Sequence, residues 1–282
     1  MVSEKLQKKI NSAIKLIRVF EPHDGTALVV AYSGGKDSDI LLQLVKEAGV
    51  KYRAIYKCTT IDPPGTIKHV QEMGVEIVRP KQTFAQLIAK KGQPIRVRRF
   101  CCEKLKEYKI LDRCAVGVRA AESAARTKRY KEPTQCRVYG ANDSVEQFFP
   151  ILWWTLDDVV EFARDRNLMF APVYYDENGV FHPERRLGCM CCPLASKKHR
   201  IEEFRQYPGM VKFYIRAIQK YIESHPNSKM AQSYNCYEAF AHDVLFNGKG
   251  EWEKVNDPGL FGERLDWKRE LEKYFQIELP DY

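Results

Sequence analysis

The residues with the clearest chemical role are Ser33–Ser38, which read Ser-Gly-Gly-Lys-Asp-Ser. The apolar run Ala27–Tyr32 precedes them and predicts a buried parallel strand. Residues 39–48 follow with apolar side chains at helical spacing, and Gly49 ends this run. The segment therefore predicts a strand, a glycine turn and the start of a helix.

A turn of this composition is suited to an anion. Gly34 and Gly35 allow the backbone to come close to a ligand. The turn amides and the helix N-terminus present donors and partial positive charge. Ser33 and Ser38 add hydroxyl donors, and Lys36 adds a cation. The combination suits a phosphate chain, although the spacing between the first Gly and Gly-Lys is longer in the Walker loop.

Composition narrows the class of protein. The chain has 282 residues, enough for one large α/β domain or one domain with an appendage. It has no long apolar run, and its largely polar first ten residues do not form the apolar stretch of a signal peptide, so we expect a cytoplasmic protein without membrane spans. The net charge of +9 favours an anionic partner: a nucleotide, and also nucleic acid. Nine cysteines favour thiol or metal chemistry over a disulfide framework.

Repeated strand and helix patterns surround the turn. Helices are expected at 3–20, 67–74 and 83–90, and strands at 52–58 and 75–78, which together predict a parallel sheet with right-handed crossovers. Polar residues Thr59, Thr60 and Asp62 follow the second strand. In open α/β sheets this end of a strand binds ligands, so ribose or phosphate contacts are expected there. A turn capped by Asp62 is the alternative.

Two further segments are rich in basic side chains. Residues 93–106 hold three arginines and two lysines around Cys101 and Cys102. Residues 116–126 hold Arg119 and Arg126, and an arginine pair can bind phosphate or sulfate through two hydrogen bonds each. Surface ion pairs with Glu122 are the alternative. Residues 127–147 are basic and rich in turn formers, and are expected to form a loop near the active site.

Cys189 and Cys192 form a Cys-x-x-Cys sequence next to Gly188 and Pro193. This spacing can turn two thiolates towards one metal, and Cys101 and Cys102 would complete a four-thiolate site. Cys191 is a third cysteine in this group, and Cys136 could replace Cys101 as a ligand. Two alternatives are thiols packed as small apolar groups and a redox-active disulfide. Thiolate ligands suit iron–sulfur clusters and zinc alike.

Four segments in this order resemble the phosphoadenosine phosphosulfate (PAPS) reductase family. They are Ser33–Ser38, the turn Thr59–Pro64, the segment Cys101–Lys106 and the element Gly117–Ser123. The family is a branch of the ATP pyrophosphatases, which cleave ATP between its α and β phosphates. The resemblance implies an adenine-nucleotide alpha-hydrolase-like α/β fold, with a doubly wound parallel sheet in a nucleotide-binding domain at 1–195. A mostly helical region would follow at 196–282.

The resemblance and the residue chemistry together give an expected site. The nucleotide-binding residues are Tyr32, Ser33, Gly34, Gly35, Lys36, Asp37, Ser38, Thr59, Asp62, Gly117, Arg119, Glu122 and Ser123; the catalytic residues are Lys36, Asp37, Arg119 and Arg126; and the metal ligands are Cys101, Cys102, Cys189 and Cys192. The cysteine arrangement is similar to that of family members which hold a [4Fe-4S] cluster. The expected cofactors are ATP, Mg²⁺ and a [4Fe-4S] cluster, with zinc as the alternative metal.

Three functions fit these features. The first is an ATP-dependent sulfurtransferase that adenylylates an acceptor, either a nucleic acid such as tRNA or DNA or a nucleotide-like substrate. A cysteine desulfurase or free sulfide would supply the sulfur, and the state of assembly, including a homodimer, stays open. The second is a sulfonucleotide reductase. The third is a non-catalytic nucleotide-binding subunit of a DNA modification or defence complex. The complete loop favours the first, because reductases of the family have a degraded loop and a terminal Glu-Cys-Gly-Leu/Ile-His motif. Cys236 is the single cysteine of residues 193–282, and its surroundings, Tyr-Asn-Cys-Tyr, do not match that motif.

Overall fold

The computed structural model describes residues 2–108, 113–138, 144–246, 248–256 and 265–282. The chain forms two compact units: unit 1 comprises residues 1–80 and 105–188, and unit 2 comprises residues 81–104 and 189–282. This division differs from the expected boundary at residue 195, because residues 81–104 belong with the C-terminal helices. Phe84 of this segment stacks on Phe213 and meets Tyr214 edge-on, at centroid distances of 6.4 and 5.5 Å.

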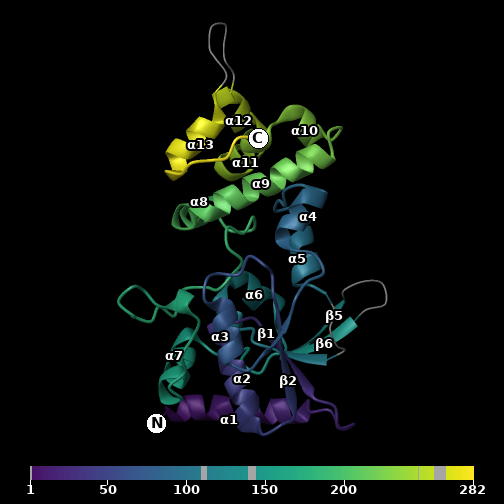
Figure 1. The fold of residues 1–282 in the computed structure, drawn as a ribbon. Helices are drawn as coiled ribbons and strands as arrows, with labels where there is room; N and C mark the ends of the chain where they lie inside the picture. Colours follow the sequence, from purple (N-terminus) through teal and green to yellow (C-terminus); the bar gives the residue numbers. More distant parts are fainter. Residues whose placement is uncertain (1, 109–112, 139–143, 247, 257–264) are drawn as a thin grey trace. The chain divides into compact units, whose positions relative to one another are not determined.

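Unit 1 is built on a six-stranded sheet in the order β3-β2-β1-β4-β6-β5. The strands are β1 (Leu28–Tyr32), β2 (Tyr52–Lys57), β3 (Glu76–Val78), β4 (Arg113–Val116), β5 (Thr134–Val138) and β6 (Ser144–Phe148). All neighbours are parallel except β5 and β6, which pair antiparallel. The expected α/β class with a parallel sheet is thus confirmed (Figure 1).

The 127–147 segment is not a loop throughout. It contains β5 and β6, in which Thr134 pairs with Phe148 and Val138 with Ser144. The alternation of exposed and half-buried residues along β5 is the period-2 pattern of an edge strand, which the turn-rich composition hid. Residues 139–143 of the expected loop lie outside the described residues.

One face of the sheet carries most of the core of unit 1. The helices of this unit are α1 (Glu4–Val19), α2 (Lys36–Ala48), α3 (Thr66–Glu72), α6 (Ala124–Arg129) and α7 (Leu156–Asp165), with short 3₁₀ helices at Ala120–Glu122 and Pro172–Tyr174. Val30 of β1 packs in one cluster with Leu6 of α1, Leu41 of α2 and Phe162 of α7. The opposite face holds a much smaller apolar cluster, which includes Val29 and Cys114.

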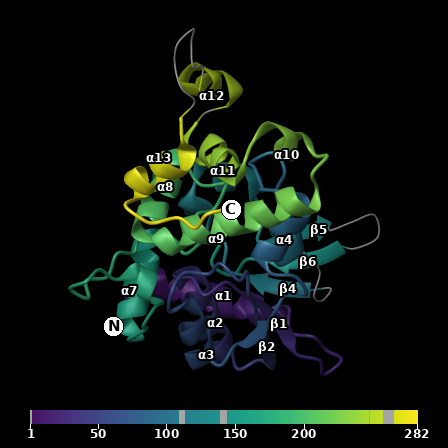
Figure 2. The same cartoon turned by 45° about the horizontal axis from the view of Figure 1, so that its top comes forward.

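Unit 2 is helical, as expected for the C-terminal region. Its helices are α4 (Phe84–Lys91), α5 (Phe100–Leu105, which ends at the boundary), α8 (Lys197–Gln206), α9 (Pro208–Ser224), α10 (Lys229–Ser233), α11 (Cys236–Leu245), α12 (Lys249–Asn256) and α13 (Trp267–Phe275). α9 is central, since α4, α8, α10 and α11 all contact it (Figure 2). Among the residues that the structure describes, no helix has the length and apolar character needed to cross a bilayer.

Candidate functional site

The segment Ser33–Ser38 forms the expected turn between β1 and the N-terminus of α2. Gly34 has a φ of +76°, and a Cβ there would lie 3.2 Å from Cγ2 of Thr66, so the turn requires glycine. Ser38 closes the turn, because its amide and its hydroxyl both donate to the carbonyl of Gly35, at 2.8 and 2.6 Å. The N-terminus of α2 is thereby held in a fixed position beside the turn.

Tyr174 supports this turn from a distant part of the chain. Its hydroxyl accepts a hydrogen bond from the Lys36 amide at 3.2 Å, and a Cβ on Gly35 would lie 3.1 Å from it. Burial raises the pKa of Tyr174 to about 12, so the group stays a neutral phenol at neutral pH. Tyr174 was not predicted from the sequence, because no local pattern indicates a contact between positions so far apart.

The Lys36 side chain is buried at the mouth of the turn, with 4% of its surface exposed. Its ammonium donates to the carbonyl of Arg185 at 3.2 Å and lies 5.1 Å from the Tyr174 ring centroid. Burial lowers the pKa of Lys36, because the charged form loses solvation. A phosphate in front of the turn would restore favourable charge contact to this ammonium.

Asp37 and Arg119 form an ion pair at the start of α2, where Asp37 also faces the polar cavity. The Arg119 Nε lies 2.7 Å from Oδ1 of Asp37, and only 3% of Arg119 is exposed. Gly117 brings the end of β4 to this point, since a Cβ there would lie 2.7 Å from the Asp37 carbonyl oxygen. The structure thus brings these three expected residues together and ties β4 to the start of α2.

A polar cavity of about 220 Å³ opens in front of the turn. Besides Lys36 its charged lining residues are Asp37, Glu122, Arg126 and Arg186. Glu122 pairs with Arg126, and it lies 3.3 Å from Nη2 of Arg186, which also donates to the Glu122 carbonyl at 2.7 Å. The Glu122 carboxylate therefore holds two guanidinium groups beside the lysine. Arg186 was not among the nucleotide-binding residues predicted from the sequence.

A second cavity, of about 430 Å³, lies on the sheet face that carries the small apolar cluster. Its floor is apolar, with Val29, Ile55 and Val116 from three neighbouring strands. It shares Ser33 and Arg126 with the polar cavity. The two cavities thus meet at the turn, and unit 1 offers an apolar compartment beside a cationic one.

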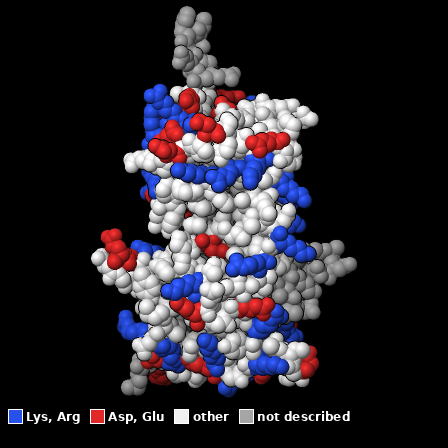
Figure 3. All heavy atoms as spheres, in the orientation of Figure 1, with Lys and Arg blue, Asp and Glu red and all other residues white. Residues whose placement is uncertain are grey.

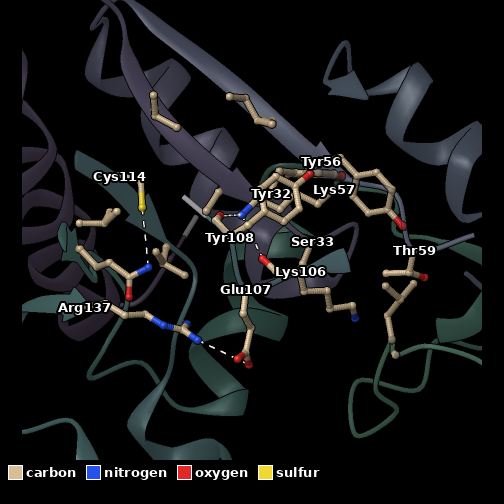
Figure 4. Close-up of a pocket in the computed structure, with 18 of the residues that line it drawn as sticks. Tyr32, Ser33, Tyr56, Lys57, Thr59, Lys106, Glu107, Tyr108, Cys114 and Arg137 are labelled. Carbon is tan, nitrogen blue, oxygen red and sulfur yellow. Dashed lines mark hydrogen bonds and ion pairs between the residues drawn. The ribbon is translucent and has the colours of Figure 1, made fainter. Parts of the chain in front are cut away.

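Lys57 projects from β2 into the apolar compartment (Figure 4). Its ammonium donates to the carbonyls of Lys106, at 3.0 Å, and of Tyr108, and lies 4.1 Å from the Tyr108 ring centroid. Burial, with a smaller contribution from Arg137, lowers the pKa of Lys57 to about 8. Arg137 itself lies 3.5 Å from Glu107 at the same cavity.

We expect Lys57 to react as a neutral amine at unusually low pH. Competitive labelling with acetic anhydride should show its reactivity rising through pH 8, because the amine form appears there rather than near the ordinary value of about 10.4. Mass spectrometry of the labelled peptide measures the reactivity at each pH. A rise that begins only near pH 10 would contradict this expectation.

Other expected nucleotide contacts have internal partners. Thr59 and Asp62 line the apolar compartment, but Thr59 donates to Asp62 through its amide and its hydroxyl, at 2.9 and 2.6 Å, as in the alternative of a capped turn. Tyr32 donates its hydroxyl to the buried Asp39, whose carboxylate also lies 3.1 Å from His69. Ser123 caps α6 and lines neither cavity.

The four expected metal ligands all belong to unit 2. Hydrogen bonding to Cys102 raises the pKa of Cys101, with further contributions from burial and from the neighbouring Cys192, so these three thiols are close to one another. No disulfide links any of the nine cysteines, all of which the structure describes. Within the described ranges, no three His, Cys, Asp or Glu residues are arranged as ligands of one metal ion. Metal binding would therefore require these thiols to move.

Cys191 is anchored in the core of unit 2 rather than grouped with those thiols. Its carbonyl accepts from the Tyr214 hydroxyl at 3.0 Å and from Arg200 Nε at 3.3 Å, and its amide donates to Glu203 at 3.0 Å. Burial raises the pKa of its thiol to about 12. These bonds fix the Cys189–Cys192 loop on α8 and α9. Cys136, the expected substitute ligand, is exposed on β5 of unit 1.

Sequence comparison finds a domain family and two curated relatives. The profile of the phosphoadenosine phosphosulfate reductase domain matches residues 27–195. An uncharacterized protein of Methanocaldococcus jannaschii is 26% identical over 231 residues, which cover 77% of this chain and 54% of that protein. An adenosine 5'-phosphosulfate reductase of Oceanobacillus iheyensis is 22% identical over 193 residues, 64% of this chain and 78% of that protein. This chain thus spans about half the length of the first relative.

Solved structures with a similar fold include two enzymes of yeasts. The phosphoadenylyl-sulfate reductase of Candida auris, solved as a phosphate complex, has a TM-score of 0.46 and 12% identity over 67% of this chain and 96% of that chain. The FMN adenylyltransferase of Candida glabrata has a TM-score of 0.41 and 17% identity over 60% of this chain and 58% of that chain. At these identities the likeness concerns the fold alone.

Proposed function

Because this chain belongs to the phosphoadenosine phosphosulfate reductase domain family, we propose that it uses its loop to adenylylate an acceptor with Mg·ATP for incorporation of sulfur. One observation carries the proposal: the turn Ser33–Ser38 is complete and opens on a cavity that holds Lys36, Arg126 and Arg186. The adjoining apolar compartment has room for the adenosine. The triphosphate would then lie across the turn, with the adenine on the sheet face.

In the proposed reaction, an acceptor oxygen attacks the α-phosphorus of Mg·ATP. The bond from the α-phosphorus to the bridging oxygen breaks, and pyrophosphate leaves with the bonding electrons. Lys36, Arg126 and Arg186 would stabilise the charge that develops on the leaving phosphates. Arg119 lines neither cavity but pairs with Asp37, which lines the polar one, so Arg119 would act as a positioning residue. Hydrosulfide would then attack the adenylylated carbon of the acceptor and displace AMP, which leaves the sulfur on that carbon. A persulfide donor would instead give a mixed disulfide, which a second thiol would cleave by forming a disulfide with the donor thiol.

The sulfonucleotide reductase remains the second candidate, because a named relative is an adenosine 5'-phosphosulfate reductase. Such a reaction needs a thiol that can attack the substrate. Cys236, the cysteine of the helical region after residue 192, is 1% exposed, and burial raises its pKa to about 12. A thiol in this setting is a poor nucleophile. This observation favours adenylylation over reduction.

Pyrophosphate and sulfite assays separate the candidates. We expect the protein to release pyrophosphate from Mg·ATP in the presence of nucleic acid isolated from cells that lack the protein. We expect no release of sulfite from adenosine phosphosulfates with a thiol donor. Sulfite release would identify the reductase. Nucleotide binding without any pyrophosphate release, with all isolated nucleic acids tested, would identify a non-catalytic subunit.

We propose in addition that Cys101, Cys102, Cys189 and Cys192 bind a [4Fe-4S] cluster or zinc. The support is a soft donor set in which three thiols are neighbours within unit 2. The anchoring of Cys191 on α8 and α9 would keep the second cysteine pair in place while the ligands close around the metal.

We expect protein prepared without oxygen to be brown and to contain about four irons per chain, because one [4Fe-4S] cluster would be bound by the four cysteines. Replacement of Cys192 by serine should lower the iron content strongly, because a thiolate ligand is lost. Replacement of Cys136, which is exposed on β5, should leave it unchanged. Elemental analysis and the visible spectrum measure both. A colourless protein with one zinc would select the alternative metal, and a metal-free protein would contradict the proposal.

A further inference from the structure

A stripe of cations runs along α9 in unit 2, outside the nucleotide site. Lys212, Arg216 and Lys220 are exposed and spaced four residues apart, so they lie on one face of the helix. In the described part of the chain, no carboxylate is within ion-pair distance of any of the three. Figure 3 shows Lys and Arg gathered in a band across this unit. Their charge is therefore available to a partner.

A basic loop in the same unit adds to this charge. Residues 95–99 read Ile-Arg-Val-Arg-Arg and are exposed, with Val97 exposed to 90%. The loop has a defined shape, since Arg98 donates from its amide to Ile95, at 2.9 Å, and from its guanidinium to Gln93, at 3.2 Å. Arg96 donates to the carbonyl of Leu194 at 3.1 Å. These bonds fix the shape of the loop, while its arginine side chains stay exposed to solvent.

The loop and the stripe meet at Tyr221. A Cβ on Gly92 would lie 3.4 Å from the Tyr221 ring and 3.6 Å from the Arg98 guanidinium, so all three groups adjoin. Tyr221 follows Lys220 in the chain and stacks on His225 at a centroid distance of 4.5 Å. Both rings are only partly buried. An aromatic pair therefore stands where the two groups of cations join.

We propose that this surface, the α9 stripe with the 95–99 loop, binds single-stranded nucleic acid. The proposal rests on the proposed function and deepens it by naming the class of acceptor. Cations along a run of about 12 Å suit successive phosphates, and partly exposed aromatic rings suit unstacked bases. An anionic membrane fits less well, because the apolar face of α9, with Val211, Tyr214 and Ile218, is buried in unit 2 and cannot enter a bilayer.

Fluorescence anisotropy with labelled single-stranded RNA and DNA of about 20 nucleotides tests the surface. Two variants remove two charges each: K212Q/K220Q on the stripe and R96Q/R98Q on the loop. The matched control, K249Q/K254Q, removes two exposed charges from α12 of the same unit. We expect each test variant to weaken binding at least fivefold at about 0.1 M salt and to reduce the slope of log K against log salt by about 1.4, and the control to change neither.

Circular dichroism should show little change in unfolding, because the substituted residues are exposed. R96Q/R98Q also removes the bonds from Arg96 to Leu194 and from Arg98 to Gln93, so the stripe variant K212Q/K220Q decides the proposal. The proposal is overturned if the wild-type protein binds neither oligonucleotide, if the control weakens binding as much as the test variants, or if vesicles with anionic lipid bind the stripe while oligonucleotides do not compete. Binding of Mg·ATP is measured in parallel. Loss of oligonucleotide binding with intact nucleotide binding supports the surface, and an oligonucleotide bound by a protein that releases no pyrophosphate would overturn only the proposed reaction.

Discussion

Replacement of Lys36 by methionine is expected to lower the rate of pyrophosphate release about 10²- to 10³-fold, the usual cost of losing one preorganised charge at a reacting group. The ammonium is buried beside the turn, where it donates to the carbonyl of Arg185 and has the carboxylates of Asp37 and Glu122 nearby. A bound triphosphate would add several negative charges next to it. Methionine keeps the length and the apolar contacts of the side chain. The effect should therefore appear in catalysis and nucleotide binding, and the unfolding temperature should stay close to that of the wild type.

Lys46→Met is the matched control, since Lys46 is exposed in the last turn of the same helix. We expect this variant to release pyrophosphate at the wild-type rate. A Lys36→Met variant that retained full activity would remove the turn from the reaction. The same variant also tests the reductase candidate, because sulfite release that survives it would show a chemistry independent of the loop.

Replacement of Gly117 by alanine should lower the free energy of unfolding by about 3 kcal/mol, at the upper end of what overpacking costs. The new methyl group would lie 2.7 Å from the carbonyl oxygen of Asp37 and 3.2 Å from the amide nitrogen of Ser38. Both atoms belong to the backbone, so β4 and the start of α2 would have to separate. Mg·ATP binding should weaken as well, because the same shift displaces Asp37 from Arg119.

Gly209→Ala provides the comparison, because a Cβ there would meet nothing within 4 Å. Gly209 lies in the first turn of α9, where alanine is tolerated, so stability should be equal or slightly higher. Thermal unfolding by circular dichroism measures both variants. Equal unfolding temperatures for the two would show that the approach of β4 to α2 is looser than the structure indicates.

Local signals were sufficient for the elements that carry the turn. The apolar strand before Ser33, the glycines and the helix that Gly49 ends all follow from short-range preferences. Gly117 and Arg119 were expected near the nucleotide from resemblance to a family. Their contacts with Asp37 give the physical reason why a glycine and an arginine occupy these positions.

Contacts between distant segments could not be predicted from the sequence. Tyr174 bonds to Lys36 across 138 positions, and Arg186 meets Glu122 across 64, with no periodic pattern to link them. Lys57 appeared only as the end of a strand, although a lysine there can point into the ligand side of the sheet. The place of residues 81–104 depends on aromatic contacts with α9, which only the folded chain creates.

The interleaved order of the two units has a consequence during protein synthesis. Residues 81–104 leave the ribosome long before α9, against which Phe84 packs. Until then the apolar side of α4 has no native cover, and it is available to chaperones or to wrong partners. A chain truncated after residue 188 would keep this exposure permanently. We therefore expect nascent chains of intermediate length to be held by chaperones, and gene fragments that end there to yield insoluble product.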